Sequence, residues 1–168
     1  VIVLGDVNPQ AQWPTTNEPV FRDSFWSELS EFVGDFGGGL LIIGGERDCP
    51  KRLQNTELKK ILPMVLDSRS STASSYTQVF HPKLTRLGLK SPLMRLDPDR
   101  QRNSRLWATD GTGLPGLYWY ERVVKAKPLA RVLAVHPTES NENGDYPLFL
   151  WQYYKSGAVF ASLVDSTW

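Results

Sequence analysis

Hydrophobic residues between positions 21 and 36 recur at intervals of three and four, which is the spacing of one face of an α-helix. Charged and polar residues fall between them, on the opposite face. Ser24 or Asp23 is suited to begin this helix, and Gly37, which tolerates positive φ, is suited to end it. The apolar positions of the helix are Phe21, Phe25, Trp26, Leu29, Phe32, Val33 and Phe36.

Short apolar runs stand on both sides of this predicted helix. Residues 1–4 precede it and end at Gly5-Asp6, whereas residues 40–43 follow it and have glycines at both ends. Four consecutive apolar residues between glycines are typical of a short strand that is buried on both faces. Strand, helix and buried strand together predict a βαβ unit, whose two strands run parallel.

The second half of the chain predicts mainly strands and loops. Residues 56–62 favour a short helix capped by Thr56 or Asn55, and Lys155-Ser156-Gly157 favours a hairpin turn between two strands. The chain is therefore predicted to be one domain over residues 1–168, with an antiparallel, strand-rich C-terminal half. The expected strands are 76–80, 117–120, 130–135, 147–154 and 158–164, and the expected polar loops are 68–75, 97–116 (with one helical turn near 105–107) and 136–146.

Composition excludes some classes of binding partner for this domain. The 168 residues are about the length of one domain, and the net charge of +1 gives no reason to expect nucleic acid or an anionic membrane as a partner. No apolar run approaches the roughly 20 residues that a membrane-spanning helix needs. Cys49 is the single cysteine, so the chain forms no internal disulfide.

Several of these motifs resemble one protein superfamily. Residues 1–7, the helix end at 32–39 and the glycine-bounded strand at 40–45 resemble the class I glutamine amidotransferase-like superfamily. They are most similar to its divergent branch in large bacterial membrane-associated proteins, often found alongside von Willebrand A-like regions. Residues 56–63, 81–87 and 164–168 are also similar to that branch.

The resemblance implies a fold, a context and a chemistry. The fold is α/β, a flavodoxin-like three-layer sandwich with a mostly parallel sheet, whose first strand and helix lie upstream of Val1. The context is a larger protein that is membrane-associated through regions outside this chain. In active members of the superfamily, the loop that matches Gly44-Gly45 supplies backbone N–H groups to an oxyanion, and a cysteine on a sharp strand-to-helix turn attacks the substrate amide.

That sharp turn is missing from this sequence. Neither Gly-x-Cys-x-Gly nor Gly-x-Ser-x-Gly occurs anywhere in the chain. We therefore expect a catalytically inactive domain that serves as a binding or structural module, with other domains of the same polypeptide or separate proteins as partners.

A cysteine-dependent amidase or glutaminase is the alternative. Its nucleophile would be Cys49, although Pro50 prevents the helix that normally follows a nucleophile. Its base and orienting carboxylate would be His136 and Glu139, which resemble the His-Pro-Glu motif of active amidotransferases with Thr138 inserted. A His–carboxylate pair is what a thiol nucleophile needs.

A ligand pocket in this fold is expected beyond the carboxyl ends of the parallel strands. No metal or cofactor is expected, because one cysteine and two distant histidines do not form a zinc site, and Asp97-Pro98-Asp99 lacks the spacing of a calcium loop. The candidate pocket residues are Asp6, Gly44, Gly45 and Glu46, joined by Asp165, Ser166 and Thr167 if the last strand points the same way.

Aromatic residues concentrate at residues 117–120 and 150–154. One interpretation is core packing with cross-strand pairs. The other is an exposed aromatic surface for a partner domain or a sugar-like ligand. The solvent exposure of Trp119 and Trp151 distinguishes the two.

Overall fold

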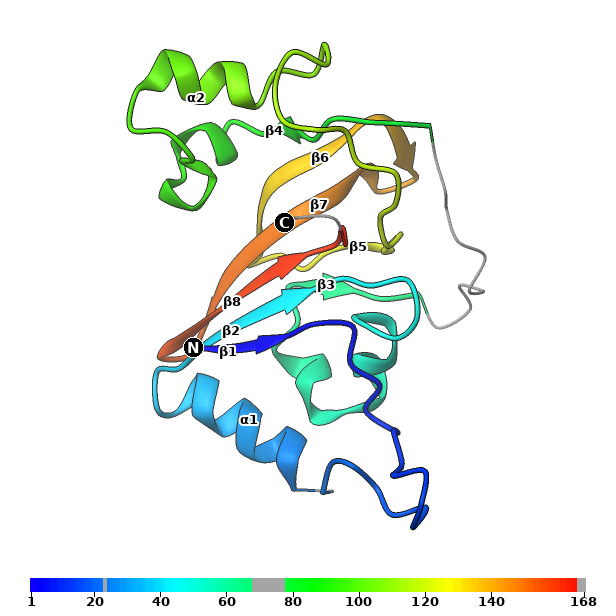
Figure 1. Cartoon of the computed structure of the whole chain (residues 1–168). Helices are drawn as coiled ribbons and strands as arrows, with labels where there is room; N and C mark the ends of the chain where they lie inside the picture. Colours follow the sequence, from blue (N-terminus) through cyan, green and yellow to red (C-terminus); the bar gives the residue numbers. More distant parts are fainter. Residues whose placement is uncertain (23, 68–77, 166–168) are drawn as a thin grey trace.

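The computed structural model of the protein describes residues 1–22, 24–67 and 78–165 (Figure 1). Its centre is a six-stranded sheet in the order β1-β2-β8-β7-β6-β4, and β3 and β5 form a separate two-stranded sheet. The strands are β1 (Ile2–Leu4), β2 (Gly39–Ile43), β3 (Met64–Val65), β4 (Lys83–Leu84), β5 (Lys125–Ala126), β6 (Arg131–Asn141), β7 (Gly144–Tyr154) and β8 (Gly157–Ser162). The helices are α1 (Phe25–Gly34), α2 (Arg100–Leu106) and the short 3-10 helices η1 (Lys51–Asn55), η2 (Glu57–Lys60), η3 (Gly88–Lys90) and η4 (Pro92–Met94).

The predicted βαβ unit is confirmed. β1 and β2 pair in parallel, and α1 connects them. The helix begins after Ser24 and ends before Gly37, which takes a φ of +71° that a side chain would disfavour. Phe36 was expected on the buried face of this helix, but it lies beyond the last turn and is 78% exposed. Asp23 lies outside the described residues.

The predicted hairpin between the last two strands is also confirmed. β7 and β8 are antiparallel, and Lys155 in their turn has a φ of +49°. The expected loop at 136–146 is wrong, because β6 and β7 extend through it and meet at a tight turn before Gly144, whose φ is +116°. These residues are polar because this end of the hairpin is largely exposed, so they lack the apolar alternation that marks a strand.

The middle of the chain holds less regular structure than the sequence predicts. Phe80 and Leu117 form an isolated bridge in place of two strands, and residues 68–77 lie outside the described part. The predicted short helix is η2, where the Thr56 hydroxyl accepts a hydrogen bond from the backbone N–H of Leu58. The expected polar loop at 97–116 contains α2, a longer helix than the single turn predicted.

The flavodoxin-like three-layer sandwich with a mostly parallel sheet is wrong. Of the five pairings in the main sheet, β1–β2 and β2–β8 are parallel, whereas β8–β7, β7–β6 and β6–β4 are antiparallel. The described residues include two α-helices, of which α1 alone connects parallel neighbours. After β2 the chain passes through 3-10 helices and loops and then forms hairpins, and a tight hairpin can only join antiparallel strands.

On one face of the sheet, no helix among the described residues packs against β1, β2 and β8 (Figure 1). α1 covers the opposite face, where Leu40, Ile42 and Val159 are fully or almost fully buried. On the uncovered face, strand register aligns one row of side chains across five strands, from β1 to β6. The row consists of Val3, Leu41, Phe160, Trp151 and Arg131.

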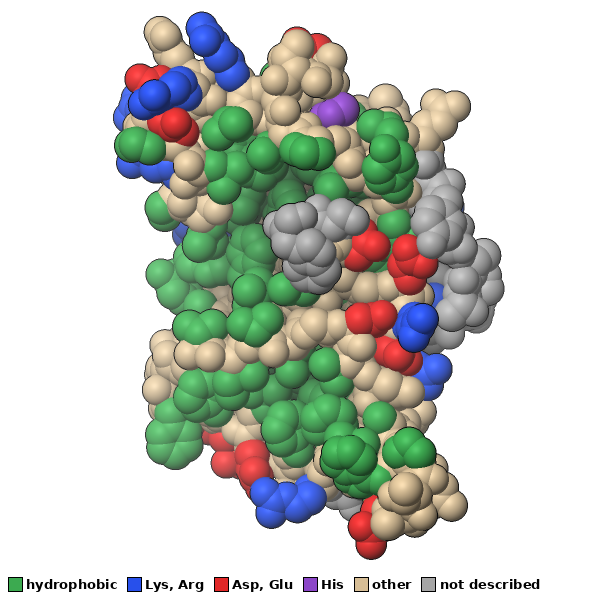
Figure 2. Space-filling view, viewed as in Figure 1, with side chains coloured by type: hydrophobic (Ala, Val, Ile, Leu, Met, Phe, Trp, Pro, Cys, Tyr) green, Lys and Arg blue, Asp and Glu red, His purple; other side chains and the backbone are tan. Residues whose placement is uncertain are grey.

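This uncovered face is rich in apolar and aromatic side chains. Val3 is 55% exposed and Tyr153, whose ring contacts Trp151, is 65% exposed. Figure 2 shows hydrophobic side chains gathered over the strands on the face turned to the viewer. Trp119, by contrast, is buried, so core packing holds for Trp119. Trp151 is half-buried and packs against the second core cluster, so its exposure does not establish an exposed aromatic surface.

Two hydrophobic clusters form the core. The first lies between the sheet, α1 and the 3-10 helices η1 and η2, and it includes Cys49. The second gathers Phe80, Tyr120 and Phe149 with side chains of β6 and β7. Among the described residues, no helix has both the length and the apolar character needed to cross a membrane.

Candidate functional site

The carboxyl ends of the parallel strands meet at one edge of the sheet, as expected (Figure 1). Asp6 follows β1, Gly44 and Gly45 follow β2, and Asp165 comes soon after β8. β6 runs in the same direction, because it is antiparallel to β7, which is antiparallel to β8. Figure 2 shows acidic and basic side chains together on the side toward which these strands point. Of the remaining candidates, Glu46 is exposed on the loop, and Ser166 and Thr167 lie outside the described residues.

Asp6 closes the loop that follows β2. One carboxylate oxygen accepts the backbone N–H groups of Asp48 at 2.7 Å and Cys49 at 2.8 Å, and the other accepts that of Arg47 at 3.2 Å. Consecutive N–H groups that converge in this way form a concave anion-binding site. A Cβ on Gly45 would lie 2.3 Å from the Asp6 side chain, so glycine is required for the carboxylate to approach.

The amides of the predicted oxyanion loop are already used within the chain. The Gly44 N–H donates to the carbonyl of Ser162 at 2.7 Å, and the Gly45 N–H donates to the carbonyl of Cys49 at 2.8 Å. An oxyanion hole needs donors aimed at the position of the developing charge. In this structure the N–H groups of Arg47, Asp48 and Cys49 donate to Asp6, and those of Gly44 and Gly45 donate to backbone carbonyls.

Cys49 is an unsuitable nucleophile. Its side chain is fully buried, and burial raises the pKa of the thiol to about 12. A backbone hydrogen bond with Val7 opposes this shift, but the carboxylates of Asp6, Asp48 and Glu121 raise the pKa further. Arg47 and Lys51 are the basic residues nearest to Cys49 in the sequence, but the charged groups that act on the thiol in the structure are acidic. Reactive cysteines need the reverse environment.

His136 lies in β6 and is held as a neutral imidazole. Its Nδ1 accepts the backbone N–H groups of Thr138 at 3.3 Å and Glu139 at 2.9 Å, which places the proton on Nε2. Nε2 is buried and has no hydrogen-bond partner among the described residues, and Glu139 Oε1 lies 3.9 Å away. The rings of Phe80 and Tyr120 pack against the imidazole at 4.4 and 4.8 Å between centroids.

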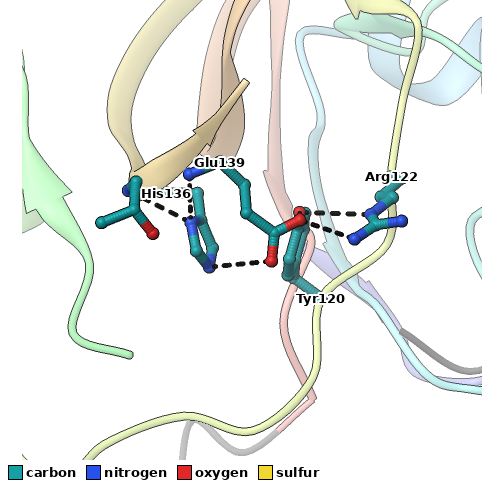
Figure 3. A network of polar contacts seen from close by, with 5 residues as sticks. Tyr120, Arg122, His136 and Glu139 are labelled. Atoms are coloured by element: carbon teal, nitrogen blue, oxygen red, sulfur yellow. Dashed lines mark hydrogen bonds and ion pairs between the residues drawn. The ribbon is translucent and has the colours of Figure 1, made fainter. Parts of the chain in front are cut away.

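Glu139 connects His136 to two residues that the sequence did not single out. Its Oε2 accepts the Tyr120 hydroxyl at 2.8 Å and pairs with Arg122 Nη2 at 2.5 Å (Figure 3). Burial opposes ionisation, but the hydrogen bonds from Tyr120 and Arg122 hold the pKa of Glu139 below its usual value. The sequence did contain a signal for this pair of residues. In an extended segment, side chains alternate between two sides, so Tyr120 and Arg122 are expected on the same side.

The extended segment 119–123 separates the two halves of the proposed catalytic set. Tyr120 packs on His136, whereas the next residue, Glu121, is close enough to Cys49 to raise the pKa of the thiol. The Glu121 N–H donates to the carbonyl of Leu163 at 2.8 Å, which fixes the segment across the end of the sheet. The structure therefore brings His136 and Glu139 together, but it places Cys49 in a different cluster of the core.

No group of three or more His, Cys, Asp or Glu side chains among the described residues is arranged to hold a metal ion. Asp97 and Asp99, the oxygen-rich pair of the sequence, have local roles. Asp99 accepts the backbone N–H of Arg102 at the start of α2, and Asp97 forms an ion pair with the same arginine.

A groove of about 590 Å³ lies beside the closed loop. Its lining residues come from the connection that follows β1 (residues 9–22), from Trp26 of α1, and from residues 52–57, which follow β2. The groove is thus formed by segments that follow two parallel strands, but none of the predicted pocket residues lines it.

The environment of His136 predicts a pH dependence of stability. Burial lowers the pKa of His136 in the folded protein, partly offset by the Glu139 carboxylate. Unfolded histidine has a pKa of about 6.5, so the unfolded chain binds the proton more readily and the free energy of unfolding falls as pH drops below this value. Urea unfolding from about pH 7.5 to about pH 5.5 should show a larger loss in the wild type than in His136→Gln. Equal losses in the two proteins would contradict this role of His136.

The chain matches no protein-family model and no curated protein sequence. Its fold is similar to that of several solved structures, among them the following two. The cytoplasmic protein STM3548 from Salmonella typhimurium aligns with a TM-score of 0.65 and 17% identity over 97% of this chain and 59% of that one. The cytoplasmic protein STM1381 from Salmonella typhimurium LT2 aligns with a TM-score of 0.68 and 20% identity over 98% of this chain and 60% of that one. The chain spans about three fifths of the length of these structures, and the likeness concerns the fold alone.

Proposed function

We propose that this chain is a catalytically inactive glutamine amidotransferase-like domain that acts as a binding or structural module of a larger bacterial protein. One observation carries the proposal: Cys49, the single thiol, is buried in the hydrophobic core and is separated from His136 by segment 119–123. Covalent catalysis by cysteine needs an accessible thiolate within hydrogen-bond reach of its base. The proposal retains the βαβ unit and its glycine turn as the basis of the resemblance and abandons the three-layer sandwich.

The occupied anion site supports an inactive domain. A functional oxyanion loop keeps its N–H groups available for substrate. Here the Asp6 carboxylate takes three of them, and Gly44 and Gly45 donate to backbone carbonyls. These bonds make the loop after β2 a structural element.

The uncovered sheet face supports a role in binding another protein layer. Parallel strands are normally covered on both faces, whereas Val3 of β1 is 55% exposed and Leu41 of β2 is half-buried on this side. Arg131 lies over the Trp151 ring at 5.2 Å and forms no ion pair with any described residue. We propose that the partner, another domain of the same polypeptide or a separate protein, presents an apolar surface with a carboxylate opposite Arg131.

The alternative function is a cysteine-dependent amidase or glutaminase that uses Cys49, His136 and Glu139. The contact that favours it is the His136–Glu139 pair, whose Nε2 and Oε1 atoms lie 3.9 Å apart. The buried thiol of Cys49 opposes it, because a thiol with a pKa of about 12 holds almost no thiolate near neutral pH.

Thiol reactivity and ammonia release test both functions together. In the folded protein Cys49 should react with 5,5′-dithiobis(2-nitrobenzoate) only as fast as the protein opens, because its sulfur is inaccessible. Glutamine should yield no ammonia above the level of Cys49→Ala. A matched control is Cys49→Ala/Ser156→Cys, whose thiol lies in the exposed turn between β7 and β8 and should react at the rate of a free thiol. Ammonia release that disappears in Cys49→Ala would establish the enzyme and overturn the inactive domain.

A further inference from the structure

The groove beside the closed loop has one apolar wall that is rigidly packed. Phe21 and Trp26 line it, and their ring centroids lie 5.0 Å apart. Phe25 contacts both rings, at 5.1 Å from Phe21 and 4.9 Å from Trp26. Trp26 is buried as part of α1, so this aromatic triad anchors the connection after β1 to the core.

Two arginines from segments far apart in the sequence line the groove. Arg22 comes from the connection after β1, is exposed, and forms no ion pair with any described residue. Arg52 comes from η1, and its Nε pairs with Asp48 Oδ1 at 2.5 Å. Because the backbone of Asp48 is held by Asp6, the closed loop also fixes the position of Arg52. The acidic residue of the lining, Glu57, pairs with Lys60, as Arg52 pairs with Asp48, so the charge of Arg22 makes the groove net positive.

The rest of the lining offers hydrogen bonds. Gln54 and Asn55 stand next to Arg52, and their carboxamides both donate and accept. A volume of about 590 Å³ lies within the range of small-molecule sites, which combine apolar walls with a few polar groups that fix orientation. Guanidinium groups bind carboxylates with paired N–H donors, a geometry that lysine cannot supply.

We propose that this groove binds a small organic carboxylate, held between Arg22 and Arg52 and oriented by the carboxamides of η1. The proposal rests on the binding role assigned to the domain and names the chemical class of its ligand. The Asp6-closed loop then has a purpose at the site: it holds Arg52, while the aromatic triad holds the segment that carries Arg22. The ligand is held by segments that follow the parallel strands β1 and β2, and α/β proteins bind small molecules outside the carboxyl ends of such strands.

Isothermal titration of the protein with citrate tests this proposal. Experiments at about 150 mM NaCl suppress weak binding to exposed charges. We expect one citrate to bind per chain in a saturable way, and the neutral trimethyl ester not to bind. Arg22→Gln and Arg52→Gln should each lower the affinity for citrate about tenfold, because each removes a charge-assisted contact. Arg86→Gln is the matched control, because Arg86 is exposed, lies near β4 and does not line the groove. The affinity of this variant for citrate should equal that of the wild type.

Three results would overturn the proposal. Citrate that fails to saturate, or that binds both groove variants as tightly as the wild type, would exclude the site. Sulfate that binds as tightly as citrate with the same dependence on Arg22 and Arg52 would show a general anion site without preference for carboxylates. Arg22→Gln leaves the closed loop intact, so it remains informative if Arg52→Gln loosens the loop. The assays of thiol reactivity and ammonia release involve none of these residues, so the two proposals fail independently.

Discussion

Replacing Leu40 with alanine is expected to lower the free energy of unfolding by about 3 kcal/mol, whereas Leu41→Ala should lower it by about 1 kcal/mol. The two leucines are neighbours in β2, so their side chains point to opposite faces of the sheet. Leu40 is 2% exposed and belongs to the cluster under α1, while Leu41 is half-buried on the face without a helix. The cost of truncation follows the number of packed neighbours that are lost, and that number differs between the two faces.

Urea unfolding of the two variants measures this difference in the free energy of unfolding. Both variants replace a leucine of the same strand with alanine, so they differ only in the face of the sheet that is affected. Equal losses would mean that both faces of β2 are packed alike and would remove the support for a protein partner on the uncovered face. The comparison therefore tests the correction of the fold and the proposed binding surface with the same measurement.

Replacing Asp6 with alanine is expected to lower the free energy of unfolding by about 2 kcal/mol. The substitution removes the acceptor of three backbone N–H groups. Three hydrogen bonds to a buried carboxylate would contribute more than about 2 kcal/mol to the free energy of unfolding. Asp6 is exposed, so water can replace part of the hydrogen bonding that the substitution removes. The loop should open, so Cys49 should also react faster with 5,5′-dithiobis(2-nitrobenzoate).

Chemical denaturation gives the stability of Asp6→Ala, and the rate of thiol modification reports the state of the loop. Asp6→Asn keeps one acceptor oxygen and should be intermediate in both measurements. Asp35→Ala is the control, because Asp35 pairs with Lys155 on the exposed surface, where an ion pair has little effect on stability. An Asp6→Ala protein with unchanged stability and an unreactive thiol would show that the loop is held by other contacts.

The closed loop also explains why the glycine turn is compatible with an inactive domain. Gly45 permits the close approach of Asp6, since a Cβ would lie 2.3 Å from its side chain. The same glycine that suits an oxyanion loop is thus required here by an internal carboxylate. A glycine pair after a strand indicates a close approach of the backbone and does not by itself indicate a substrate.

The local sequence pattern was sufficient to predict those helices and strands whose apolar residues recur at regular spacing or stand between turn residues. The spacing of apolar residues predicted α1, the glycine-bounded run predicted β2, and the Lys155-Ser156-Gly157 turn predicted the last hairpin. Each of these features depends on neighbours within a few residues, so the chain carries the full signal in one stretch. The exposed end of the β6–β7 hairpin carries no such signal, and the sequence therefore predicted a loop there.

The sequence by itself determined the parallel pair β1–β2, the edge of the sheet where polar residues gather, and the lack of a nucleophile turn. Only the tertiary structure decided how the remaining strands pair, that Asp6 fills the loop after β2, and that segment 119–123 separates Cys49 from His136. Periodicity shows which side of an element is buried, but not what it is buried against. Asp6 and Cys49, or Tyr120 and Glu139, meet because distant segments are brought together, and the direction of each pKa shift follows from those contacts.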